Sequence, residues 1–86
     1  MTGISRNTQR EQLARRIECM RPTDDAVHEA MLEATQYGVT YAAIAGATGS
    51  TELRAQRWSA GADIPGTVSE RRAILSTLQR LLSELP

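Results

Sequence analysis

The sequence predicts an all-α protein of five helices, and three observations lead to that prediction. Apolar residues recur at helical spacing, as Leu13, Ile17 and Met20 do at i, i+4 and i+7. No segment carries the alternating pattern of a strand. Aromatic residues make up only 3% of the 86 residues, so the core must be aliphatic, which suits packed helices.

The first predicted helix follows a frayed start over residues 1–6. The run Thr8-Gln9-Arg10-Glu11 fits a capping box, in which a hydroxyl and a carboxylate satisfy free backbone N–H groups at a helix start. We expect the helix to extend to about Met20, because Pro22 cannot continue it.

The second predicted helix begins at the cap Thr23, where Asp24 and Asp25 place negative charge at the favourable end of the helix dipole. Gly38 is predicted to end it in a left-handed conformation. Its buried stripe is predicted to be Val27, Ala30, Met31 and Ala34.

The third and fourth predicted helices, Thr40 to Thr48 and Thr51 to Ala60, are joined by a tight turn at Gly49. Small residues at the contact, Ala45 and Ala42, allow two helices to cross closely, while Ile44 and Trp58 supply core contacts. This arrangement is typical of a helix-turn-helix.

A loop over residues 61–66, with Ile64 directed inward, precedes the fifth helix. Thr67-Val68-Ser69-Glu70 is a second capping-box pattern, and the helix extends to about Leu85. We therefore expect one domain over residues 1–86, with a basic N-terminal helix (1–22), a helix-turn-helix core (23–61) and a C-terminal helix (67–85).

The composition excludes several classes of protein. A single cysteine, Cys19, rules out an internal disulfide, and we expect a partly buried reduced thiol. No apolar run approaches the ~20 residues that span a bilayer, so we expect a cytoplasmic protein with no membrane contact.

The helix-turn-helix segment resembles the Cro/CI-type repressors of phages and plasmids. The residues that carry the resemblance lie between about 24 and 85 and are Ala45, Gly49, Arg57-Trp58-Ser59-Ala60-Gly61, Ile64-Pro65, Arg71, Arg72, Leu75 and Leu78. The resemblance implies a lambda-repressor-like fold and a sequence-specific repressor that binds double-stranded operator DNA in the bacterial nucleoid and needs no cofactor.

Two residues depart from that family's pattern. Ser50 and Ala55 stand where aliphatic residues are usual, and we expect Leu53 to compensate by rotating inward.

Residues at the start of the fourth helix would meet the base edges in the major groove. These predicted base contacts are Thr51, Glu52, Gln56 and Arg57. Arg57 can donate two hydrogen bonds to guanine, Gln56 can pair with adenine and Glu52 can accept from cytosine. The alternative for each residue is a solvated helix face.

Phosphate contacts are predicted around the start of the third helix and at the turn, where backbone N–H groups and hydroxyls are available. The predicted residues are Thr40, Tyr41, Ser50 and Arg54. The arginines of the first helix are either further phosphate contacts or a solubilising surface.

The fifth helix carries more apolar residues than one narrow stripe needs, which predicts a homodimer interface. The predicted interface residues are Ile74, Leu78, Leu81, Leu82 and Leu85. Two alternatives remain open. The interface could lie on the first helix, at Leu13 and Ile17, or the leucines could all pack on their own chain.

No constellation for catalysis or metal binding is evident. The chain has no lysine, and its one histidine, His28, is expected on a solvated helix face rather than in a metal site. We expect no enzymatic activity.

The formal net charge of zero is unusual for a DNA-binding protein. All ten basic residues are arginine, and the second helix is acidic. These features favour a second hypothesis, a helix-turn-helix-shaped module that binds protein, such as an antitoxin, an anti-activator or a polymerase-associated factor.

Overall fold

The computed structural model describes residues 5–86, and in that part of the chain five α-helices and no strand are present. The helices are α1 (Arg6–Cys19), α2 (Asp24–Gln36), α3 (Tyr41–Thr48), α4 (Glu52–Ser59) and α5 (Val68–Glu84). The prediction of an all-helical chain is therefore confirmed. The predicted frayed start is wrong for Ser5 and Arg6, and residues 1–4 lie outside the described residues.

Each helix begins with a hydroxyl cap that accepts a hydrogen bond from the backbone N–H three residues later. The caps are Ser5, Thr23, Thr40, Thr51 and Thr67. A cap of this kind stabilises a helix by about 1 kcal/mol. Four of them match the predicted starts, but the first does not. Thr8 lies inside α1, where its Oγ1 is 2.9 Å from Ser5 Oγ.

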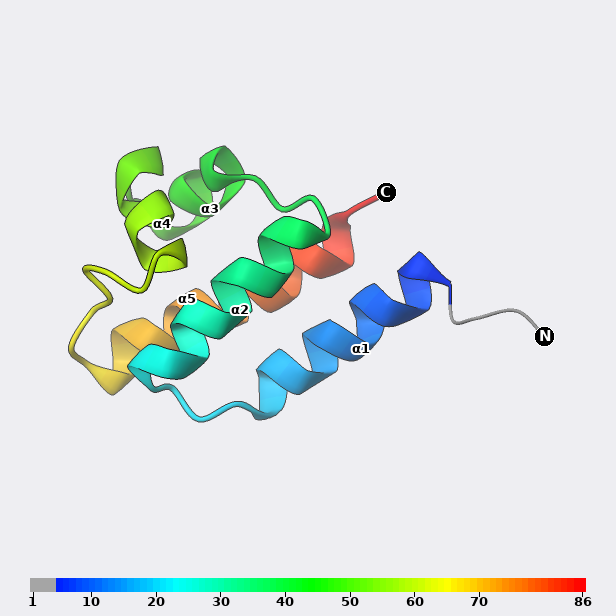
Figure 1. Cartoon of the computed structure of the whole chain (residues 1–86), viewed down its shortest axis with the longest axis horizontal. Coiled ribbons are helices and arrows are strands. Elements are labelled where there is room, and N and C mark those ends of the chain that lie inside the picture. The colour runs from blue at the N-terminus through cyan, green and yellow to red at the C-terminus, as the bar shows by residue number, and fades with distance from the viewer. Residues whose placement is uncertain (1–4) are drawn as a thin grey trace.

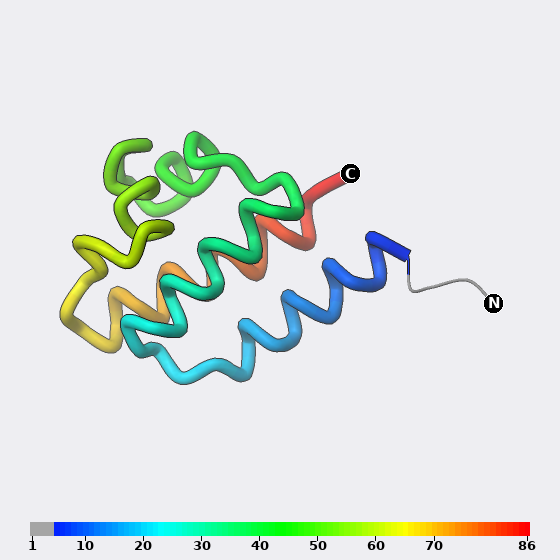
Figure 2. The backbone as a smooth tube through the Cα atoms, in the orientation of Figure 1, coloured from blue at the N-terminus to red at the C-terminus, as the bar shows by residue number. Residues whose placement is uncertain are grey.

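The three longer helices form the body of the molecule. Helix α1 packs along α5, and α2 packs against α5 and more lightly against α1. Helices α3 and α4 pack on each other and lie together on the side of α2 and α5 that faces away from α1 (Figure 1). The tube in Figure 2 shows how the chain passes from α2 through this short pair before it returns along α5.

The core lies where these helices meet. It draws Leu13 and Ile17 from α1, Trp58 from α4 and Leu78 from α5, all almost fully buried. The predicted stripe of α2 is buried in full, at Val27, Ala30, Met31 and Ala34. Because apolar contacts come from all five helices, no helix is free to dock independently of the others.

The apolar residues of α5 do not form the surplus surface that the sequence suggested. They are covered by α1, α2 and α3, which all pack against α5, and Leu13 and Ile17 of α1 are fully buried in the same core. Ile74, Leu78 and Leu82 are buried within one chain, and Leu81 and Leu85 are half-buried and pack against the core. The first three residues therefore cannot serve as the predicted dimer interface without opening the core. The same holds for the alternative interface on α1.

Candidate nucleic-acid interface

The link between α3 and α4 is a turn of three residues, Gly49 to Thr51. Gly49 adopts a left-handed conformation with φ of 70°, which an L side chain rarely adopts. The backbone N–H of Ser50 then donates to the carbonyl of Ala45 at 2.9 Å, and the Thr48 hydroxyl donates to the carbonyl of Ile44 at 2.7 Å. These bonds close the end of α3 around the carbonyls of Ile44 and Ala45, and α4 begins directly at the turn.

Helix α4 turns one face to the core and the opposite face to solvent. Its buried residues are Ala55, Trp58 and Ser59. At 3.6 residues per turn, Leu53, Gln56 and Arg57 lie on the other side, and all three are exposed. The expectation that Leu53 rotates inward is wrong, because its exposed fraction is 55%. Ala55 itself fills the inward position and is fully buried.

The end of α4 is fixed by two contacts. The indole Nε1–H of Trp58 donates to the backbone carbonyl of Asp63 at 3.0 Å, which ties the following loop to the helix. Gly61 has a φ of 81°, and a Cβ at this position would lie 3.4 Å from Nδ1 of His28 on α2. Gly61 therefore allows both the left-handed turn and the close approach to α2. Ile64 is half-buried against the core, as predicted.

The predicted base contacts are spread along α4, with Thr51 and Glu52 at its start and Arg57 in its last turn. Gln56 and Arg57 are exposed on its outer side, Glu52 is exposed at its first residue, and Thr51 caps its first turn by accepting from the N–H of Arg54. Arg57 forms an ion pair with Asp63, in which its Nη1 lies 3.1 Å from the carboxylate oxygen Oδ2. The sequence did not predict this ion pair, although the spacing of six residues across a loop is short.

The residues predicted to contact phosphates differ in how far their side chains are exposed. Thr40 is exposed at the start of α3, where its hydroxyl accepts from the N–H of Ala43. Tyr41 is half-buried, and its hydroxyl lies 3.4 Å from Ser59 Oγ, so this side chain helps to hold α3 against α4. Arg54 is exposed, and its guanidinium carbon lies 5.7 Å from the centroid of the Trp58 ring.

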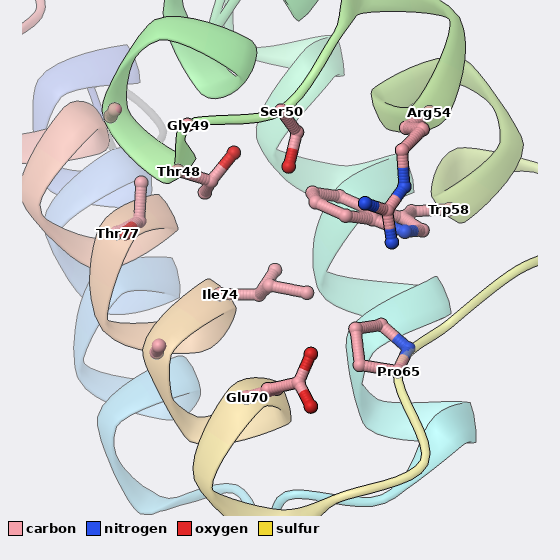
Figure 3. Close-up of a pocket in the computed structure, with 11 residues that line it drawn as sticks. Thr48, Gly49, Ser50, Arg54, Trp58, Pro65, Glu70, Ile74 and Thr77 are labelled. Atoms are coloured by element: carbon pink, nitrogen blue, oxygen red, sulfur yellow. The ribbon is translucent and has the colours of Figure 1, made fainter.

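A groove of about 330 Å³ lies beside the turn. Figure 3 shows Ser50, Arg54 and Trp58 on one side of it, facing Glu70 and Ile74 of α5. Ser50 is half-buried and lines this groove. No local pattern of residues indicates the groove, because its walls come from segments about twenty residues apart that meet only in the folded chain.

The charges of the acidic helix α2 are partly neutralised within the chain. Asp24 pairs with Arg71 of α5 at 3.3 Å, and Glu33 pairs with Arg16 of α1 at 3.3 Å. Most of the arginines are engaged on their own chain in a similar way. Those with a hydrogen bond or ion pair are Arg6, Arg10, Arg16, Arg57, Arg71 and Arg80. Of the two arginines on α4, Arg57 is paired with a carboxylate and Arg54 is exposed beside Trp58.

Two expectations about reactive side chains are wrong. Cys19 is exposed rather than partly buried. His28 is half-buried beneath Gly61 rather than on a solvated face, and its Nδ1 is buried with no hydrogen-bond partner among the described residues. Within residues 5–86, no group of three His, Cys, Asp or Glu side chains is placed to hold a metal ion. No helix in this part of the chain has the length and apolar character to cross a membrane.

Comparisons of the chain with protein-family models, with curated proteins and with solved structures give no match.

Proposed function

We propose that the chain is a sequence-specific DNA-binding protein that inserts α4 into the major groove of an operator and represses transcription by occluding the promoter. The observation that carries the proposal is the outer face of α4. Gln56 and Arg57 are exposed together there, and Glu52 is exposed at the first residue of the helix, directly after the three-residue turn at Gly49. The major groove is about 12 Å wide, which admits one α-helix with its side chains.

The chemistry of this face suits base recognition. Neither Glu52 nor Gln56 makes a side-chain hydrogen bond within residues 5–86, so both are available to base edges. Gln56 can form two hydrogen bonds with adenine, and Glu52 can accept one from cytosine. The start of α4 is the part of the helix that we propose enters the groove, as in helix-turn-helix arrangements.

We propose further that two copies act as a homodimer on a palindromic operator, since one short helix reads few base pairs. Of the residues predicted for the interface, Leu81 and Leu85 are the two that remain partly accessible. An interface that includes them would leave the core of each chain intact.

A selection of bound duplexes from random DNA tests the proposal. Wild-type protein should enrich a defined motif, and Gln56→Ala should bind that motif about 5- to 150-fold more weakly, as expected for the loss of one two-bond base contact. Gln12→Ala is the matched control, because Gln12 is equally polar and exposed on α1. If no motif is enriched over random DNA, the proposal is wrong.

The second candidate is a module of the same shape that binds protein. The Arg57–Asp63 ion pair and the zero net charge favour it, because both reduce attraction to phosphates. The salt dependence of DNA binding separates the candidates. A repressor should lose affinity with salt in proportion to its few phosphate contacts. Weak, sequence-independent binding that disappears at moderate salt would favour the protein-binding module.

A further inference from the structure

Leu53 has the most outward position on α4. The buried residues Ala55 and Trp58 lie on the opposite face of the helix, and Gln56 and Arg57 flank Leu53 one turn later. The exposed fraction of Leu53 is 55%, which makes it one of three large apolar side chains on the surface of the described residues. The other two, Leu32 and Val68, belong to α2 and α5.

Leu53 contributes little to the fold. It does not belong to the buried core or to the half-buried residues that pack against it. Alanine has a slightly higher helix propensity, so the helix itself does not require leucine here. The side chain is therefore dispensable for stability, although it leaves apolar surface in water at the centre of a polar face.

We propose that Leu53 is a specificity-determining residue that contacts the C5-methyl group of a thymine in the operator. The inference rests on the proposed DNA-binding function and names a part of the sequence that the operator must contain. The thymine methyl is the distinctive apolar group among the base edges of the major groove, so a single leucine between polar residues matches it. A protein partner would instead be expected to meet a cluster of apolar anchors, which this face lacks.

The position of Leu53 also limits where the thymine lies. Side chains three apart on a helix are about 5–6 Å apart at their Cβ atoms, and base pairs are stacked at about 3.4 Å. The thymine therefore lies within about two base pairs of the one that Gln56 contacts.

Replacement of single thymines by deoxyuridine tests the inference, because it removes only the methyl group. On the selected motif, wild-type protein should bind about fourfold more weakly when one particular thymine is replaced, which corresponds to about 0.8 kcal/mol for one methyl group. Leu53→Ala should bind the thymine and deoxyuridine duplexes equally well. Leu32→Ala is the matched control, since it truncates an exposed leucine on α2. It should keep the wild-type ratio of affinities for the thymine and deoxyuridine duplexes.

The outcomes separate this inference from the function on which it rests. If the chain selects no motif, the proposed function fails, and the thymine contact fails with it. If a motif is selected but no deoxyuridine substitution weakens binding, or Leu53→Ala keeps the wild-type ratio, the thymine contact alone is wrong. Thermal unfolding followed by the fluorescence of Trp58 should give the same midpoint for Leu53→Ala and wild type, so a loss of the ratio cannot come from unfolding.

Discussion

Arg57 and Asp63 form an ion pair, with 3.1 Å between Nη1 and Oδ2, on the outer side of the helix that we propose reads DNA. Both side chains are about half exposed, so the pair is hydrated and stabilises the fold by no more than about 1 kcal/mol. A two-bond contact of arginine with guanine discriminates by about 1–3 kcal/mol. Arg57 can therefore leave Asp63 and bind a guanine, and the Asp63 carboxylate competes with that base for the guanidinium.

Asp63→Asn should tighten operator binding by up to about fivefold, because Arg57 is released and a negative charge near the DNA is removed. The backbone of Asp63 is left-handed, with φ of 57°, a conformation that asparagine tolerates well. The carbonyl that accepts from Trp58 is retained. Titration of labelled operator, measured by fluorescence anisotropy, gives the affinity.

The control for that variant is Glu84→Gln, which removes one carboxylate from the pair with Arg80 on α5. It should change operator affinity much less than Asp63→Asn. Equal affinity of Asp63→Asn and wild type would contradict the role of Asp63 as a competitor.

Gly61→Ala should lower the free energy of unfolding by about 1–2 kcal/mol. An alanine there must adopt a left-handed backbone, which is strained for an L residue, while its Cβ would only be in van der Waals contact with the ring of His28 at 3.4 Å. Gly46→Ala is the opposite case, because Gly46 lies inside α3 with open space around it. This variant should raise the free energy of unfolding by about 0.5–1 kcal/mol. Urea unfolding followed by Trp58 fluorescence measures both. A shift of the same sign in the two variants would refute this account.

Arg71→Ala should destabilise the fold by at least about 2 kcal/mol. The Arg71 side chain is mostly buried and donates to the backbone carbonyls of Pro22 and Pro65 and to the carboxylate of Asp24. It therefore joins the start of α2 and the loop after α4 to α5. Arg72→Ala, at an exposed neighbouring position, should stay within about 0.5 kcal/mol of wild type. Equal unfolding midpoints for the two variants would contradict this role.

The parts of the fold that sequence could predict are those fixed by neighbouring residues. Threonine caps such as Thr23 and Thr51, and the left-handed glycine at Gly49, satisfy backbone groups within a few positions, so local spacing identifies them. The start of α1 was missed because Ser5 and Thr8 are both competent caps three residues apart, and Ser5 adds one turn of helix.

The site was harder to predict because it depends on contacts between distant segments. Spacing placed Gln56 on the exposed side of α4. It could not show that Ala55, rather than Leu53, fills the inward position where α4 packs against α2 and α3. The engagement of Arg57 depends likewise on a loop carboxylate whose direction is set by the left-handed backbone at Asp63.

The dimer can be tested by comparing a core leucine with a half-buried one. Leu78 is fully buried, so Leu78→Ala should lower the free energy of unfolding by about 2–5 kcal/mol at any protein concentration. Leu81 is half-buried, and an arginine there can extend its charged end into water, so Leu81→Arg should remain folded.

If two copies associate through the accessible edge of α5, Leu81→Arg should weaken self-association and operator binding together, while Leu78→Ala lowers stability alone. Sedimentation velocity at tens of micromolar, with and without operator, measures the association. A wild-type chain that stays monomeric and binds a single half-site would remove the homodimer from the proposal and leave α4 as a reader that acts alone. A wild-type dimer that Leu81→Arg leaves intact would instead place the interface on a different surface, because Leu13 and Ile17 of α1 and the buried face of α5 already belong to the core of each chain.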